Sequence, residues 1–307
     1  MRITTSMVQR NVLSDLNKLS EKLAKTQSKA SSGKEIMRPS DDPYNTARAM
    51  GLRSALNANT QYQSNISDAQ GWQNSTETAL DSITRDINRA QALLLEGSSD
   101  TADTSARASV ADEIDQIIQG IKETANVSDG DRYLMSGTAT ATPPYKLGDD
   151  DAYQGNEAGL DPTVPGVIRE IGPGVTISIN SVGREILGDG RANPTDGKLL
   201  NALRDISEHL RSDDGTALRG ADVDNLQSQL DNILKVRSRN GAMTNRLEAA
   251  ASRLEQIEGA VTEQLSDTED ADIAKTLIEF NSQSAAYQAS LRAGANIVQS
   301  SLMDFLR

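Results

Sequence analysis

The stretch from residue 273 to residue 305, IAKTLIEFNSQSAAYQASLRAGANIVQSSLMDF, decides the fold because it is a long helix candidate without an ordinary surface. Its large apolar residues follow the alternating four-and-three spacing of a heptad stripe. Between Phe280 and Ser301 the only charged residue is Arg292, so the helix lacks the charged outer face of a surface helix. We therefore predict that other helices surround it. The large apolar members of the stripe are Ile273, Leu277, Phe280, Tyr287, Leu291, Val298 and Phe305.

The beginning of the chain carries a second stripe with the same rhythm. Neither stripe has an apolar partner nearby in the sequence, which leaves two interpretations. The two ends could pair with each other as an intramolecular hairpin, or they could bury themselves in further copies of the protein. We favour the second, and we call the two stripes together the assembly seam. Its N-terminal members are Val8, Val12, Leu16, Leu19 and Leu23.

The composition favours thin helical cores in an elongated, mainly α chain. The 307 residues are 36% hydrophobic and 3% aromatic, with a mean hydropathy of -0.50. There is no cysteine and one histidine, His209, which excludes thiol nucleophiles, disulfides and multi-histidine metal sites. We expect His209 to be a surface or half-buried side chain of an ordinary helix.

No motif predicts catalysis, a cofactor or a metal ion, so we expect the protein not to be an enzyme. Gly197 and Lys198 resemble part of a phosphate-binding loop, but Leu199 stands where Ser or Thr must hold magnesium. The run Asp149–Asp151 could offer oxygen ligands to calcium. Tyr153 does not fit the EF-hand loop pattern, however, and we predict a solvated acidic turn there.

The net charge of -13 is unevenly distributed. Residues 1–40 carry +5 and residues 273–307 carry +1, so the part between them carries -19. Such an acidic body repels nucleic acid and anionic membranes. Neither a secretory signal nor an apolar run of membrane-spanning length is present, which indicates a cytoplasmic protein or one exported without signal cleavage. Lys18, Lys22, Lys25 and Lys29 recur at helical spacing and predict the solvated face of a helix.

The first half of the chain predicts two long helices. Residues 30–43 form a connector that ends with Asp42 as N-cap and Pro43 at the first helical position. A helix then runs to about Leu95, with Gly71 as the expected break. After a loop at residues 96–105, the apolar spacing from Val110 to Ile121 predicts a helix that returns.

Residues 143–190 do not follow the helical pattern of the rest of the chain, and they predict a small β-rich insertion. Val175, Ile177 and Ile179 alternate with polar residues, and the Gly-Pro-Gly turn before them predicts a hairpin. Because this unit has its own strand pattern, we expect it to be dispensable for assembly, and we expect the rod to stay helical without it. The sequence thus predicts a terminal pair of residues 1–43 with 266–307, a helical rod of residues 44–142 with 191–265, and the insertion.

Helices resume at residues 199–210 and again from about Val223. Gly241 lies inside the second of these and indicates close helix packing or a bend, because glycine costs about 1 kcal/mol relative to alanine in a helix. Ser266 followed by Glu269 matches a capping box, which predicts that the terminal helix starts there.

Five segments in order, MRITTSM, LAKTQSKASSGKEIMRPSDDP, DGDRYLMSGTATATPPY, VRSRNGAMTNRLE and SLMDFLR, resemble the flagellin superfamily. Within it, they resemble the bacterial hook–filament junction proteins. The resemblance covers roughly residues 1–145 and 220–307, and leaves the insertion unassigned. One departure is Met135, where the family often has Phe. The positions that match the family's motifs are Gly33, Pro39, Asp41, Asp42, Pro43, Tyr133, Gly137, Arg237, Gly241, Asn245 and Arg246.

The resemblance implies a structural, non-catalytic role in the extracellular flagellum. Subunits of this family leave the cell through the flagellar type III exporter without signal cleavage, with an export chaperone on the C-terminal helix. They form a homo-oligomeric ring on the preceding hook-associated protein, and flagellin assembles on that ring. The terminal helices, residues 1–43 and 266–307, would form the inner tube.

Two alternatives remain. A flagellin-type filament subunit is the nearer one, but Pro39, Ser40 and the final SLMDFLR differ from what flagellins generally have at these places. The other is a cytoplasmic signalling coiled coil of the chemoreceptor kind. Proteins of that class need no β insertion, and their function does not require a terminal helix with so few charged residues.

Overall fold

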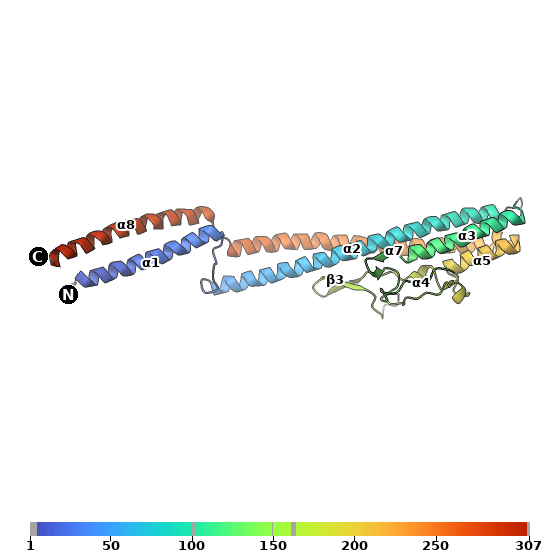
Figure 1. The fold of residues 1–307 in the computed structure, drawn as a ribbon, viewed down its shortest axis with the longest axis horizontal. Helices are drawn as coiled ribbons and strands as arrows, with labels where there is room; N and C mark the ends of the chain where they lie inside the picture. Colours follow the sequence, from blue (N-terminus) through green and yellow to red (C-terminus); the bar gives the residue numbers. More distant parts are fainter. Residues whose placement is uncertain (1–4, 100–101, 149, 161–163, 306–307) are drawn as a thin grey trace. The chain divides into compact units, whose positions relative to one another are not determined.

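A computed structural model describes residues 5–99, 102–148, 150–160 and 164–305, although not the side chains of residues 5, 6, 8, 9 and 296–305. Helices dominate, and two short antiparallel strand pairs interrupt them (Figure 1). The helices are α1 (Thr5–Ser32), α2 (Pro43–Gly97), α3 (Thr104–Ala125), α4 (Gly183–Ile186), α5 (Leu199–Ser212), α6 (Gly215–Arg219), α7 (Ala221–Glu269), α8 (Ile273–Phe305) and the 3₁₀ turn η1 (Gly190–Ala192). The strands are β1 (Ser128–Asp129), β2 (Arg132–Tyr133), β3 (Ile168–Gly172) and β4 (Val175–Ser178).

The chain divides into two compact units. The first contains the described residues up to Ala58 and those from Gln256 onward, and the second contains Asn59–Glu255. The division falls inside α2 and inside α7. Each of these long helices therefore belongs to both units. In the described part of the chain no helix is long and apolar enough to cross a membrane.

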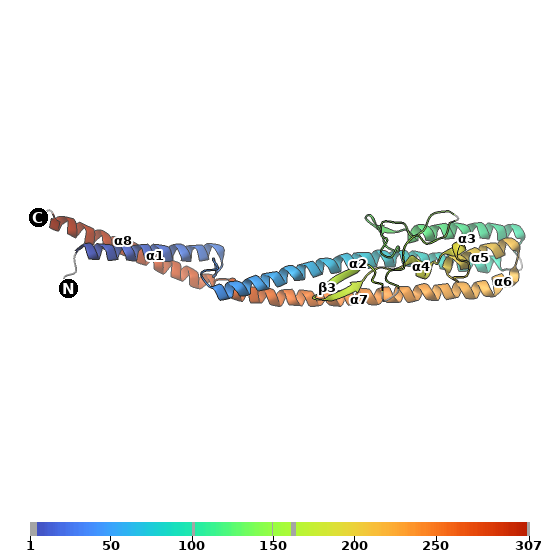
Figure 2. The ribbon, with the colours of Figure 1, turned by 90° about the horizontal axis from the view of Figure 1, so that it is seen from below.

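In the first unit α1 and α8 lie side by side (Figures 1 and 2). The connector after α1 ends as predicted. Asp42 caps α2, because its Oδ1 accepts a hydrogen bond from the Asn45 amide at 3.0 Å and α2 starts at Pro43.

The predicted start of the terminal helix at Ser266 is wrong. Helix α7 continues through Glu269, and its Ser266 side chain donates to Asp270 Oδ2 at 2.6 Å. The cap of α8 is Asp272, whose Oδ1 accepts from the Lys275 amide at 3.0 Å. Ser266 and Asp272 both have side chains suited to capping a helix. Ser266 does not act as a cap because the hydrogen bonds of α7 continue past it.

The two glycines that predicted interruptions do not interrupt their helices. Helix α2 passes through Gly71, and α7 passes through Gly241. A Cβ atom on either glycine would meet nothing within 4 Å, so neither serves close packing. The preference against glycine, about 1 kcal/mol, is small beside the packing of helices of 55 and 49 residues.

The second unit has two apolar cores, and both include residues of the insertion. In one, Trp72 of α2 and Leu247 of α7 pack with Ile171, Ile177 and other residues. The predicted hairpin is confirmed, since β3 and β4 pair antiparallel with Arg169 opposite Ile177 (Figure 2). In the other core, α2, α3, α5 and α7 enclose side chains that include Met135, Tyr145, Ile186 and Leu187.

Because side chains of the insertion complete both cores, the expectation that the rod stays intact without it is not supported, whereas its dispensability for assembly stays a prediction. The prediction of a solvated acidic turn is wrong for Asp151, and Asp149 lies outside the described residues. Asp151 is 1% exposed and bridges Lys122 of α3 and Arg204 of α5. Asp150 is exposed. A carboxylate beside two cations is buried as a salt bridge, which the local sequence does not reveal.

His209 is half-buried, as expected, and its Nδ1 lies 2.8 Å from Asp222 Oδ2. Burial alone would lower the pKa of His209. The hydrogen bond to Asp222 and the carboxylates of Asp222, Asp205 and Asp214 outweigh this effect and raise the pKa.

This raised pKa predicts a pH-dependent stability. A raised histidine pKa stabilises the fold fully below the unfolded value of about 6.5, and the contribution disappears as pH rises through the folded value. The wild type should therefore lose more urea resistance between about pH 6 and pH 9 than His209→Gln does. Equal losses of urea resistance in the two proteins would show that the His209–Asp222 pair does not contribute to the pH dependence of stability.

Candidate assembly surface

Gly294 of α8 faces α1 closely. A Cβ atom there would stand 3.1 Å from Val12 Cγ1 and 3.8 Å from Leu16 Cδ1. With a side chain at this position, Val12 would have to shift by a few tenths of an ångström. Further along the pair, Thr26 donates its hydroxyl hydrogen to Gln283 Oε1 at 2.7 Å, which links α1 to α8.

The most shielded stripe of α8 only partly coincides with the predicted heptad stripe: it shares Phe280, Tyr287 and Gly294 with it, but leaves Ile273, Leu277 and Leu291 exposed. It consists of Thr276, Phe280, Gln283, Ser284, Tyr287, Ser290 and Gly294. Small and polar residues alternate in it with two aromatic ones. Among the described side chains of α1 and α8, only Thr26, Thr276 and Gly294 are fully buried. The pairing of α1 with α8 therefore uses up little of the apolar surface.

Large apolar side chains of the assembly seam remain in water. Ile273, Leu277 and Leu291 are 44%, 47% and 44% exposed. The other described members are half-buried, and the side chains of Val8, Val298 and Phe305 lie outside the described residues. An apolar stripe that stays exposed on a helix marks a contact surface for another protein chain. The half-buried members are Val12, Leu16, Leu19, Leu23, Phe280 and Tyr287.

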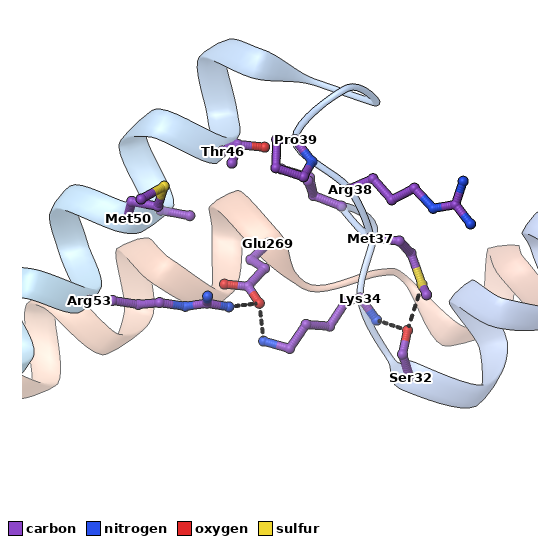
Figure 3. A pocket seen from close by; sticks show the side chains of 11 residues that line it. Ser32, Lys34, Met37, Arg38, Pro39, Thr46, Met50, Arg53 and Glu269 are labelled. Atoms are coloured by element: carbon purple, nitrogen blue, oxygen red, sulfur yellow. Dashed lines mark hydrogen bonds and ion pairs between the residues drawn. The ribbon is translucent and has the colours of Figure 1, made fainter.

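A buried carboxylate joins the connector to the break between α7 and α8 (Figure 3). Glu269 is 3% exposed, and its Oε1 accepts from both the Lys34 ammonium and the Arg53 guanidinium. Beside it the Glu35 amide donates to the Glu269 carbonyl at 2.8 Å, and the Ala271 amide donates to the Gly33 carbonyl at 2.9 Å. These contacts hold residues more than 200 positions apart, and sequence patterns gave no signal for them.

The motif residues of the connector shape its two ends. Gly33 has φ of +71°, and its amide donates to the Lys29 carbonyl, which ends α1. Asp41 accepts from Lys25 Nζ at 2.9 Å, and this hydrogen bond lowers the pKa of Asp41. Pro39 lines a cavity between the connector and α2.

The remaining motif residues belong to the second unit. Gly137 has φ of +67°, and a Cβ atom there would collide with Asn156. Arg237 pairs with Glu77 at 2.7 Å and with Asp81 at 3.0 Å, which ties α7 to α2. The others lie outside the core: Tyr133 is half-buried, and Gly241, Asn245 and Arg246 are exposed.

Two sequence families match most of the chain. The bacterial flagellin N-terminal helical region matches residues 3–140, and the bacterial flagellin C-terminal helical region matches residues 223–306. The unmatched residues between them include the hairpin β3–β4 and helices α4 and α5.

Several relatives match the chain over nearly their whole length. The flagellar hook-associated protein 3 of Escherichia coli is 28% identical, with 95% of this chain and 96% of that protein covered. That of Salmonella typhimurium is 26% identical over the whole of both chains, as is the flagellin of Bacillus subtilis.

Solved structures show the same fold. A flagellar hook-associated protein of Vibrio parahaemolyticus superposes with a TM-score of 0.65 at 22% identity, over 75% of this chain and 100% of that one. The flagellar junction protein of Legionella pneumophila gives a TM-score of 0.55 at 13% identity, over 74% and 100%.

Proposed function

Because this chain belongs to the flagellin superfamily and groups there with the hook-associated proteins 3 of the hook–filament junction, we propose that it builds a ring at that junction. Copies join through the assembly seam, with one side of the ring against the preceding hook-associated protein. The other side receives flagellin. Residues 1–43 and 266–307 then act as the inner-tube part of each subunit.

One observation supports this role above the others. The α1–α8 pair leaves Ile273, Leu277 and Leu291 between 44% and 47% exposed. Burial of apolar surface yields about 25 cal/mol per Å², and these side chains are available to copies of the chain. A hairpin formed for its own stability would have turned them inward.

The protein is a structural component of the extracellular flagellum, like its relatives. Its export through the flagellar type III route, without signal cleavage, forms part of the proposal. So does a chaperone on α8 before assembly, since an apolar helix with so little charge would otherwise associate too early.

The flagellin-type filament subunit is the competing function, and the Bacillus subtilis flagellin covers this chain equally well. A filament subunit adds copies without limit, whereas a junction subunit stops after one closed ring. The signalling coiled coil is excluded by the superfamily membership.

A deletion strain tests the proposal. Cells without this protein should build hooks but no filaments, and flagellin monomers should appear in the culture medium. Expression of the wild-type chain from a plasmid should restore filaments, as seen by electron microscopy. Normal filaments in the deletion strain would rule out the junction role, and long filaments grown from the purified protein alone would make it a filament subunit.

A further inference from the structure

The connector between α1 and α2 lies between two cavities. One, of about 450 Å³, separates it from α2 and is the cavity of Figure 3. The other, of about 430 Å³, separates it from α1. Met37 and Arg38 line both cavities. The middle of the connector is therefore a thin wall with space to move on each side.

The middle of the connector also makes few bonds to its surroundings. Residues 37–41 are exposed. No described residue hydrogen-bonds to the backbone of Ile36, Met37 or Pro39. A segment with exposed side chains and few hydrogen bonds opens at a low free energy. Contacts with the rest of the first unit hold the connector on either side of this segment.

Two exposed ion pairs tie the connector to α1. Lys25 Nζ lies 2.9 Å from Asp41 Oδ1, and Lys29 pairs with Glu35. In each pair one side chain is more than half exposed, Lys25 at 53% and Glu35 at 56%. Ion pairs of this kind contribute little free energy, and salt screens them. We call these two pairs the lysine bridges.

A buried carboxylate ties the connector to α2 and α7. Glu269 is 3% exposed and pairs with Lys34 of the connector and with Arg53 of α2, as Figure 3 shows. The backbone strengthens this contact, since the Glu35 amide donates to the Glu269 carbonyl at 2.8 Å. Salt screens partly buried pairs much less than exposed ones. We call Glu269, Lys34 and Arg53 the Glu269 clamp.

The chain links the α1–α8 pair to α2 and α7 through two segments, the connector and residues 270–272 between α7 and α8. The Glu269 clamp and the backbone bridge between Lys34 and Asp270 join these two segments to each other. The helix pair is thus attached through one buried contact and two exposed ones. When the exposed contacts break, it turns about the buried one.

We propose that the connector is a hinge, with the Glu269 clamp as its pivot and the lysine bridges as its latches. When the latches release, residues 36–40 move into one of the two cavities, and the α1–α8 pair changes its direction relative to the start of α2. No helix has to unwind. Within the proposed ring, such a hinge lets one subunit fit two different neighbours. It is a property of the single subunit, so the monomer tests it whether or not the ring exists.

Distances between spin labels test the latches. The chain has no cysteine, so Ser20→Cys on α1 and Ala55→Cys on α2, both at exposed positions, take up labels alone. Between 0.1 M and 1 M salt the Debye length falls from about 10 Å to about 3 Å. The distribution of the α1–α2 label distance should become about twice as broad over this range. A distribution of unchanged width would overturn the hinge.

Two controls separate the hinge from a general effect of salt. Labels at Ser20→Cys and Ala289→Cys, on the paired helices α1 and α8, should give the same distance distribution at both salt concentrations. Lys25→Ala together with Lys29→Ala should broaden the α1–α2 distribution already at 0.1 M. A changed α1–α8 distance would mean that the pair itself opens, and a narrow distribution in the double variant would mean that the lysine bridges are not latches. Either result contradicts the proposal.

Trypsin tests the pivot, because the Glu269 clamp holds the cleavage site after Lys34. Glu269→Gln should speed this cleavage about tenfold, measured by mass spectrometry as a new N-terminus at Glu35. Asp270→Asn is the matched control. The Asp270 carboxylate is half exposed and 3.9 Å from Lys34, so its loss should change the rate less than about twofold. Equal cleavage of Glu269→Gln and the wild type would show that Glu269 is not the pivot.

Discussion

Replacing Asp151 with alanine should lower the free energy of unfolding of the second unit by about 3–5 kcal/mol, because two buried cations lose their common partner. Lys122 and Asp151 both have side chains with 0% exposure, and that of Arg204 is 7% exposed. Water cannot replace the carboxylate at such a site. The measurement is urea unfolding of the purified chain, followed by circular dichroism.

The geometry explains the size of this effect. The Lys122 ammonium uses its three donors on the Gly148 carbonyl, the Asp150 carbonyl and Asp151 Oδ1, at 2.7, 3.0 and 3.1 Å. The Arg204 guanidinium donates to both oxygens of Asp151 at 3.1 Å. Burial alone would raise the pKa of Asp151, but the hydrogen bonds from Arg204 and Lys122 outweigh it and lower the pKa.

The neighbouring residue offers a matched control. Asp150 is exposed, and its side chain lies 3.6 Å from Lys146 at the surface, so Asp150→Ala should cost less than about 1 kcal/mol. Similar losses for the two variants would mean that the buried charges are solvated in the native protein.

Asp151 also illustrates where prediction from the sequence ends. The long helices, the hairpin and the Asp42 cap could be predicted, because each depends on spacing or on residues a few positions apart. The burial of Asp151 depends on Lys122 and Arg204, which lie 29 and 53 positions away. A run of three aspartates gives no local sign of such partners.

The same distinction holds in the terminal unit. The heptad pattern identified the apolar residues of α8, including Phe280 and Tyr287, which lie in its shielded stripe. It also passes through Gly294, but it could not show which side chains of the partner helix lie there, since that depends on the rotation of α8 against Val12 and Leu16. The link from Lys34 to Glu269 spans 235 positions, and no sequence motif marks it.

The predictions made from two glycines were wrong for a related reason. Gly71 and Gly241 predicted a break and a bend, because glycine is an unfavourable helix residue. The penalty is local and small, whereas the helix is held by contacts along its whole length. Gly294 packs against α1 in the terminal pair, and the heptad spacing places it on the stripe between Leu291 and Val298.

Leu291→Asp should abolish filament formation without destabilising the monomer. Leu291 is 44% exposed and lies beside the shielded stripe of α8, so a carboxylate there stays hydrated in the free subunit. In the proposed ring a neighbouring copy covers the same position, and an unpaired buried charge costs about 3–5 kcal/mol. Cells with this variant should have hooks, no filaments and flagellin in the medium.

A second aspartate on the same helix provides the control. Ala285 is exposed and lies seven residues before Arg292, the only charged side chain between Phe280 and Ser301, so both residues share one side of α8. That side already accepts a charge, and Ala285→Asp should still form filaments. Equal helicity of the two variants by circular dichroism excludes an effect on folding. If Leu291→Asp assembles as well as Ala285→Asp, the assembly seam is not the surface through which the copies join. An interface that excludes water at its apolar stripe cannot tolerate a new, unpaired carboxylate there.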